Sequence, residues 1–241
     1  MHASILTIAF AAALLVSLLV KFWLASRQMR HVAAHRDAVP PAFAGTISLA
    51  AHQRAAEYTL AKGRFGLIAM AVGTAVLLGW TLLGGIELLN TTVRDALQPR
   101  FGDLAYQLAL LGAFALIGAV IELPLDLYGT FGLEQRFGFN RTTWKLYTTD
   151  MLKGALVGVL IGAPIAALVL WLMHAAGRWW WLWAWGVWMA FNLMILVLYP
   201  TVIAPLFNKF EPLTDESLKA RVQALMARCG FAAKGLSLIH I

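Results

Sequence analysis

The stretch WWWLWAWGVWMAFNLMILVLYPTVIAPL, residues 179–206, contains no charged side chain. A helix needs about 20 mostly apolar residues to cross the hydrocarbon core of a bilayer, so this run is long enough to span it. Four more stretches qualify, at residues 4–24, 66–89, 104–125 and 151–173. Backbone donors in lipid must be satisfied internally, and the alternating pattern of a membrane barrel is absent. We therefore predict an all-α fold, a polytopic transmembrane helical bundle with five spans.

The composition excludes other classes of protein. Of the 241 residues, 61% are hydrophobic and 13% are charged, against about 45–50% and about 25% in soluble domains. A typical soluble enzyme is therefore excluded. The ten tryptophans argue against disorder, because disordered chains lack the apolar area that offsets chain entropy. The single cysteine, Cys229, excludes a disulfide framework and a four-cysteine zinc site.

Lysine and arginine are divided unequally between the connections. The segments 21–64, 136–153 and 209–234 hold sixteen of them, and the two other loops hold three, Arg94, Arg100 and Arg178. Such an excess marks the cytoplasmic side, so we predict a periplasmic N-terminus and a cytoplasmic tail in a bacterial inner membrane. Because topology and anionic headgroups account for the net charge of +7, we expect the lipid bilayer, and no nucleic acid, as a partner.

The bundle is predicted to cover residues 1–206, with a cytoplasmic loop at 25–65 and a tail at 207–241. In the loop, Pro40-Pro41 breaks the chain and an alanine-rich helix is expected from Ser48. In the tail, Asp215 and Glu216 are expected to begin a short amphipathic helix, since acids favour a first helical turn. Its apolar stripe must pack on something and consists of Leu218, Val222, Leu225 and Met226.

Polar residues inside the spans are candidates for function, because a carboxylate in lipid costs several kcal/mol. Glu122, just before Pro124 in the third span, is the first candidate, and Asn192 in the fifth span is the second. The alternatives are that Glu122 pairs with a basic residue at the interface and that Asn192 only bonds to another helix. His31 and His35 share one helix face as a pair of zinc ligands does, but Val32 replaces the glutamate of HExxH.

Two further segments are more specific. One reads FGFN (137–140) followed by T-x6-D-x-x-K-G, which ends in Asp150, Lys153 and Gly154, and the other reads YPTVIAPLFNKFEPL (199–213). Together with HRDAVPPAF (35–43) and HQRAAEYT (52–59), they resemble the CAAX prenyl endopeptidase family of integral-membrane zinc metallopeptidases, in its bacterial branch. The resemblance extends over about residues 28–235.

This resemblance implies a zinc-dependent endopeptidase with a large intramembrane chamber. Its substrates would be peptides or proteins cleaved near a prenylated or otherwise membrane-delivered C-terminus. Zinc would be held by an HExxH helix and a later glutamate, polarising the scissile carbonyl and activating water. The residues we expect to pack around or line the chamber, rather than to catalyse, are Glu122, Glu134, Phe137, Gly138, Asn140, Asp150, Asn192, Pro205, Asn208 and Lys209.

The chain departs from the family pattern because none of its six histidines is followed by glutamate, so it has no HExxH. We therefore expect residues 207–241 to be the start of an incomplete cytoplasmic catalytic domain, whose missing C-terminal part would be a partner of the apolar stripe. This chain is expected to bind no zinc and to be inactive alone. The alternative is a complete five-span transport or binding protein without hydrolytic activity. A transporter favours matching broken spans in two halves, and the sequence shows no internal repeat.

Overall fold

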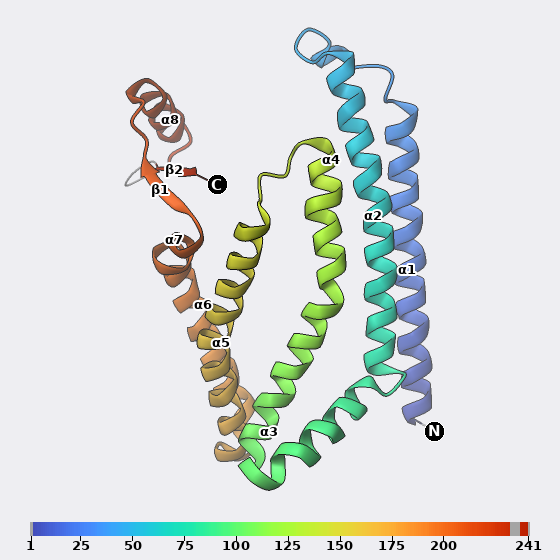
Figure 1. The fold of residues 1–241 in the computed structure, drawn as a ribbon, viewed down its shortest axis with the longest axis vertical. Helices are drawn as coiled ribbons and strands as arrows, with labels where there is room; N and C mark the ends of the chain where they lie inside the picture. Colours follow the sequence, from blue (N-terminus) through green and yellow to red (C-terminus); the bar gives the residue numbers. More distant parts are fainter. Residues whose placement is uncertain (1, 232–236, 241) are drawn as a thin grey trace. The chain divides into compact units, whose positions relative to one another are not determined.

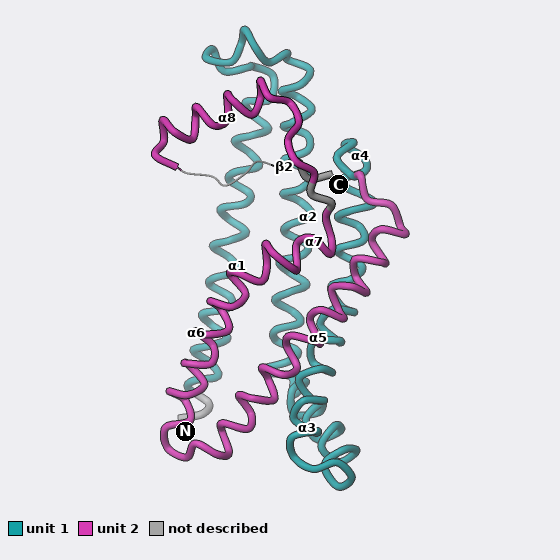
Figure 2. The backbone as a smooth tube through the Cα atoms, turned by 90° about the vertical axis from the view of Figure 1, so that its left-hand side faces the viewer, with its two compact units in different colours: residues 1–140 teal, residues 141–241 magenta. Residues whose placement is uncertain are grey.

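The computed structural model describes residues 2–231 and 237–240, and Figure 1 shows an almost entirely helical chain. Five helices are long and apolar enough to cross a membrane, at Ile5–Ala34, Leu49–Thr81, Gly85–Phe137, Trp144–Ala175 and Gly177–Phe207. This confirms the predicted helical bundle. The chain forms two compact units, residues 1–140 and 141–241 (Figure 2). The predicted division at residue 206 stays a prediction.

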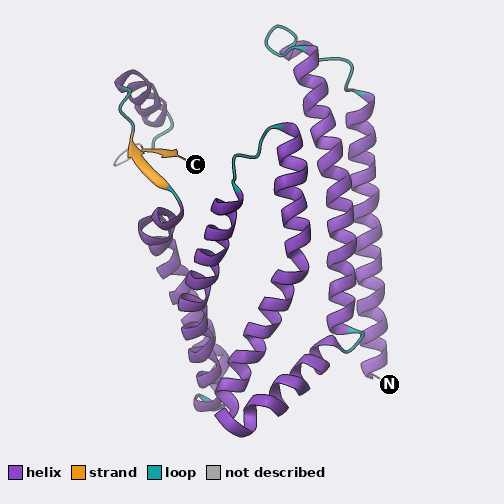
Figure 3. Cartoon of the chain, viewed as in Figure 1, coloured by secondary structure: helices purple, strands orange, loops and turns teal. Residues whose placement is uncertain are grey.

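The first unit contains α1 (His2–Ala34), η1 (Pro41–Phe43), α2 (Leu49–Thr81), α3 (Gly85–Leu127), η2 (Tyr128–Glu134) and α4 (Gln135–Phe137). Helices α1 and α2 run antiparallel side by side (Figure 3). The predicted start of α2 is confirmed, because the Ser48 hydroxyl accepts a hydrogen bond from the Ala51 amide at 3.2 Å and caps the helix. Both helices reach further into the loop 25–65 than the predicted spans do.

The second predicted span, 66–89, is wrong at its C-terminal end. Helix α2 ends at Thr81, and α3 begins at Gly85 after Gly84 in the left-handed conformation (φ 79°). A glycine tolerates this conformation without steric cost, so Gly84 allows the chain to turn. Hydropathy does not detect the break, because Leu82, Leu83 and Ile86 continue the apolar run.

Helix α3 is kinked rather than straight. Its backbone leaves helical geometry at Gly102 (φ 78°), three residues after Pro99, where a proline removes a helical hydrogen bond. Two side-chain hydrogen bonds cross the kink, from Gln98 to Asp103 at 2.6 Å and from the Tyr106 hydroxyl to Asn90. The third predicted span, 104–125, is therefore the part of α3 that follows the kink.

The second unit contains two long antiparallel helices and the tail. Its elements are α5 (Trp144–Ala175), η3 (Gly177–Trp179), α6 (Trp180–Leu198), η4 (Tyr199–Ile203), α7 (Ala204–Phe207), β1 (Lys209–Pro212), α8 (Glu216–Arg228) and β2 (Ser237–His240). Pro200 and Pro205 lie in the first turns of η4 and α7, and Asn208 is extended. The fifth span therefore changes geometry at its prolines and ends before Asn208.

The tail contains a helix at the expected position and an element that was not expected. Helix α8 begins where Asp215 and Glu216 place it, and Leu218 and Leu225 of its apolar stripe are 41% and 60% exposed. The addition is a two-stranded antiparallel sheet, in which Lys209 pairs with His240 and Pro212 with Ser237. Strands of four residues carry too little periodicity to be predicted from sequence.

Burial within the described residues is sparse. Ala56, Leu133 and Phe137, which are 6%, 6% and 9% exposed, are the buried apolar residues of that part of the chain. Most other large apolar side chains are exposed along the five long helices, including the six tryptophans of residues 179–188. Exposed apolar surfaces of this extent mark contact with a membrane or a partner. Two of the three buried residues, Leu133 and Phe137, lie close together at the end of η2 and in α4 of the first unit.

The cap of α8 gives a prediction about pH. The Leu218 amide and the Ser217 hydroxyl, at 3.0 and 2.8 Å, donate to Asp215 and hold the pKa of its carboxyl below the ordinary 3.8. The cap therefore stabilises α8 above about pH 3.8, and this contribution is lost as the pH falls through the lowered pKa. We expect hydrogen exchange at Ser217 and Leu218, corrected for intrinsic rates, to lose protection in acid. Asp215→Asn, which caps without titrating, should show no such pH dependence.

Candidate functional site

A charged cluster joins α2 to the segment that follows α3. The Tyr58 hydroxyl donates a hydrogen bond to Glu134 Oε1 at 2.6 Å, and Lys62 Nζ lies 3.2 Å from the Tyr58 oxygen and 3.6 Å from Glu134. Tyr58 and Lys62 are four residues apart and share one face of α2, since this spacing is close to one helical turn. The Glu134 carboxylate thus has two partners on one helix.

The same junction contains two of the three buried apolar residues of the described chain, Leu133 and Phe137. The Tyr58 ring meets Phe137 edge-on at 5.2 Å and Phe139 at 4.8 Å between centroids. Phe137 is 9% exposed, whereas Phe139 is 59% exposed. We call this junction the α2–α4 seam, formed by Tyr58, Lys62, Leu133, Glu134 and Phe137.

Gly138 and Asn140 shape the chain at the end of the seam. Gly138 ends α4 in the left-handed conformation (φ 80°), where a side chain would be strained. The turn allows the Phe139 and Asn140 amides to donate to the Glu134 carbonyl at 2.9 and 3.3 Å. Arg54 adds a hydrogen bond to the Phe137 carbonyl at 3.4 Å. Four of the residues predicted from sequence therefore lie together here: Glu134, Phe137, Gly138 and Asn140.

A cavity of about 700 Å³ lies between α2 and α3, and we call it the α2–α3 cavity. Its charged lining residues are Lys62, Glu122, Asp126 and Glu134. Its other lining is mainly apolar or small and includes Val72, Gly73, Val76, Leu77, Trp80, Phe114, Gly118 and Ile121. The volume is that of a small-ligand site, and such sites are largely apolar with a few polar groups. The predicted candidate Glu122 therefore faces this cavity, and Glu134 joins it to the seam.

The second unit brings the two other sequence motifs together. Lys153 of α5 donates a hydrogen bond from Nζ to the Leu206 carbonyl of α7 at 3.1 Å and lies 5.9 Å from the Phe207 ring centroid. The Asp150 carboxylate is 3.8 Å from the same ammonium. Helix C-termini leave carbonyl groups without intrahelical donors, and Lys153 supplies one.

The remaining predicted residues of this unit lie at the same end of α7. Pro205 is in its first turn, and Asn208 closes the helix through its amide, which donates to the Ala204 carbonyl at 3.0 Å. Lys209 begins β1. Asn192 lies apart from them in α6, where it is exposed and donates to the Trp188 carbonyl of its own helix at 2.7 Å. This contact is local and does not join two helices.

Sequence reasoning missed four residues of these clusters, Arg54, Tyr58, Lys62 and Lys153. The first three recur every four residues along α2, which puts them on one face. That spacing was visible in the sequence, but the partner that makes it informative, Glu134, lies 76 residues from Tyr58. Lys153 stands in the D-x-x-K-G motif, and its partner Leu206 is 53 residues away.

The histidines of the first loop are close in space but do not form a metal centre. The His31 and His35 rings are 4.2 Å apart, and His35 Nδ1 hydrogen-bonds to the His31 carbonyl at 2.8 Å. His52 Nε2 is likewise 3.1 Å from the His35 carbonyl. Within the described residues, no group of three or more His, Cys, Asp or Glu side chains is placed to hold a metal ion. Catalytic zinc takes three protein ligands, so these residues do not fit it.

Comparison with known proteins gives the family. A sequence profile described as CAAX prenyl protease N-terminal, five membrane helices, matches residues 28–209. The chain belongs to this CAAX prenyl protease family. The family description names five membrane helices, the number found here. The predicted resemblance is confirmed, while nothing in these matches assigns the chain to a bacterial branch.

The matches to individual relatives cover most of this chain. CAAX prenyl protease 1 homologs of Oryza sativa subsp. japonica and Homo sapiens are 32% and 30% identical over 87% and 92% of it, but over only 50% and 48% of their own length. The crystal structure of S. mikatae Ste24p matches with a TM-score of 0.84 and 26% identity, over 95% of this chain and 54% of that chain. The chain thus spans about half the length of the relatives it matches.

The Lys153 contacts give a testable prediction. Lys153→Met keeps the length of the side chain but leaves the Leu206 carbonyl without its donor. A hydrogen bond to a charged group contributes about 1.5–3 kcal/mol, and the 44% exposure of Lys153 reduces this to roughly 1 kcal/mol. We expect hydrogen exchange at 206–212 to accelerate about five-fold. Lys145→Met, an exposed lysine of the same helix, should leave the rate unchanged, and equal rates in both variants would contradict the prediction.

Proposed function

We propose that residues 1–241 are the membrane portion of a zinc-dependent endopeptidase that cleaves peptide bonds near the C-terminus of prenylated or otherwise membrane-delivered substrates. The observation that supports this most directly is the α2–α3 cavity, which combines an apolar wall with carboxylates and a lysine. Membership of the CAAX prenyl protease family supports the reaction class. Zinc would be held by residues other than those described here, which offer no suitable group.

In this proposal the chain's own residues position and enclose the substrate. The apolar wall of the α2–α3 cavity would receive an apolar or extended chain, because burial of such surface is favourable. Glu122 and Lys62 would interact with its polar backbone or charged groups. The α2–α4 seam would fix the wall by holding Glu134 between α2 and α4. Lys153, Asn208 and Pro205 would fix the direction in which the chain leaves the membrane at Lys209.

The reaction is tested with membranes that contain the product of the complete open reading frame. Release of the C-terminal tripeptide from a prenylated CAAX peptide is the expected result, and a zinc chelator should abolish it. Glu122→Gln should raise KM or lower kcat without a loss of protein. The same membranes expressing only residues 1–241 serve as the control. Absence of cleavage of both prenylated and unprenylated peptides by the complete product would contradict the protease proposal.

We also propose a periplasmic N-terminus and a cytoplasmic tail in a bacterial inner membrane, supported by the division of sixteen against three basic residues. Single cysteines at Ala3, Asp103 and Ala233, placed after replacement of Cys229, test this orientation. A membrane-impermeant thiol reagent added to the periplasm should label the first two and leave the third unlabelled. Labelling at residue 233 from the periplasm would reverse the proposed orientation.

A further inference from the structure

A second groove lies beside the α2–α3 cavity and has the opposite charge. It has a volume of about 490 Å³ and is lined by nine described residues, of which two are arginines, Arg64 of α2 and Arg136 of α4, and none is acidic. Phe65, Leu125 and Leu133 line both hollows, whereas Glu122, Asp126 and Glu134 line only the first. The junction of α2 with η2 and α4 therefore separates acidic from basic groups. We call this second hollow the arginine groove.

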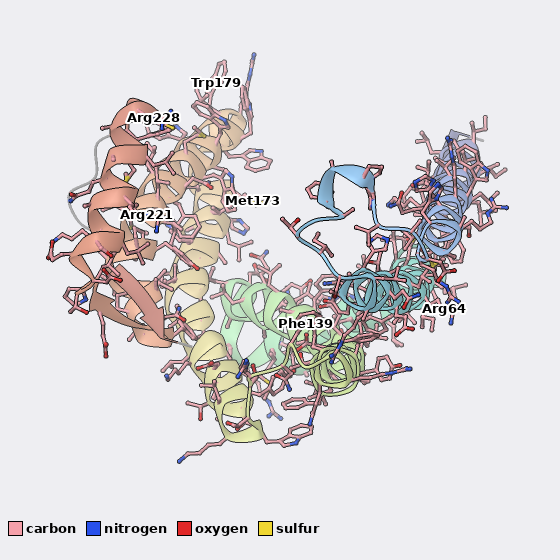
Figure 4. All side chains as sticks on the ribbon, turned by 90° about the horizontal axis from the view of Figure 1, so that it is seen from above. Arg64, Phe139, Met173, Trp179, Arg221 and Arg228 are labelled. Atoms are coloured by element: carbon pink, nitrogen blue, oxygen red, sulfur yellow. The ribbon has the colours of Figure 1, made fainter. Side chains whose placement is uncertain are left out.

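The arginines of the groove are available to a ligand. Arg64 is exposed and, within the described part of the chain, has no hydrogen-bond or ion-pair partner. Arg136 is exposed and lies 5.7 Å from the Phe137 ring centroid, a contact that leaves guanidinium donors unused. Figure 4 views the first unit from this end and labels Arg64. Two unpaired guanidinium groups bind a phosphate well, because their planar donors match its oxygens.

The depth of the groove identifies the kind of phosphate. Arg64 lies two residues before the predicted second span at 66–89, and Arg136 lies beyond the predicted third span at 104–125, so both are expected at the membrane boundary. Below them the lining is apolar, with Phe65, Ile68 and Leu125. A free phosphate ion would use only the basic end, whereas a phospholipid would use the whole groove. Basic pockets between membrane helices on the cytoplasmic side bind anionic headgroups.

We propose that the arginine groove binds one anionic phospholipid, with the headgroup phosphate at Arg64 and Arg136 and an acyl chain along Ile68 and Leu125. Tyr128, which also lines the groove, is an amphipathic ring of the kind found at headgroup level. A lipid in this position would contact η2, α4 and α2 at once. Phe65 and Leu133 line both hollows. The lipid would thus cover these two side chains from the groove, while they also form part of the wall of the α2–α3 cavity.

Lipid retention by the purified chain tests the site without reference to peptidase activity. Native mass spectrometry is carried out in detergent with equal amounts of phosphatidylglycerol and phosphatidylcholine. We expect one phosphatidylglycerol to be retained in preference. Each arginine near a membrane contributes about a five-fold factor, so Arg64→Gln with Arg136→Gln should weaken phosphatidylglycerol binding roughly 25-fold and leave phosphatidylcholine unchanged.

Controls separate this site from general surface charge. Arg30→Gln removes an arginine that does not line the groove and should not change retention. The charge-conserving Arg64→Lys with Arg136→Lys should keep the part of the preference that comes from charge and lose the part that needs planar donors. It also provides a folded comparison if the glutamine variant denatures early. Unchanged retention of phosphatidylglycerol in a folded glutamine variant would overturn the proposal. So would displacement of the lipid by inorganic phosphate at equal concentration, since the ligand would then be the free ion.

Discussion

Purified as residues 1–241, the protein is expected to hold well under one zinc ion per chain and to hydrolyse no CAAX peptide above a zinc-free control. Catalytic zinc requires three protein ligands and a water molecule, with neighbouring groups that orient the ligands. His31 and His35 are the closest histidine pair, and Val32 stands where HExxH has its glutamate. The described residues offer no third ligand to this pair. The expected activity is therefore the uncatalysed background.

Metal content by inductively coupled plasma mass spectrometry and a fluorogenic CAAX peptide give the two measurements. His31→Ala with His35→Ala is the matched control, because it removes any weak chelation by the pair. Stoichiometric zinc that disappears in this variant would show that the first loop is a metal site. Hydrolysis by residues 1–241 would overturn the prediction of inactivity and require a base near that loop, such as Asp37.

Phe137→Ala is expected to destabilise the first unit by about 3 kcal/mol, near the lower end of the range for a buried phenylalanine. Phe137 is 9% exposed and packs on Tyr58, so its removal leaves a cavity beneath the Tyr58–Glu134 hydrogen bond. We expect a destabilisation at the lower end of this range because the seam lies at one end of the helices, where neighbouring side chains can move to fill part of the cavity. The loss should also loosen the wall of the α2–α3 cavity, which Leu133 and Glu134 share.

Phe139→Ala is the matched control, since Phe139 also touches Tyr58 but is 59% exposed. It should cost less than about 1 kcal/mol, the usual range for one aromatic contact. Both variants are compared by thermal denaturation in detergent, followed through tryptophan fluorescence. Equal midpoints for the two variants would show that the seam contributes no more to stability than the surface does.

The sequence determined the class of the protein, because five long apolar runs have one stable solution in lipid. It also located the starts of two helices, after Ser48 and at Asp215 and Glu216, since a helix start depends on local backbone donors. The motif residues Glu134, Phe137 and Gly138 were identified by resemblance. Their proximity followed from the motif itself, since all three lie within the five positions 134–138.

Only the tertiary structure decided what these residues contact. Tyr58 and Glu134 are 76 residues apart, and Lys153 and Leu206 are 53 apart, so no local spacing relates them. The break at Leu82–Gly84 lies within a continuous apolar run. Hydropathy is high on both sides of the break, so it does not reveal where one helix ends and the next begins. The separation of acidic and basic linings on the two sides of Phe65 and Leu133 likewise depends on how α2 packs against η2 and α4. Charge counted along the chain reports only which end of a helix faces the cytoplasm, whereas packing decides which groups share a hollow.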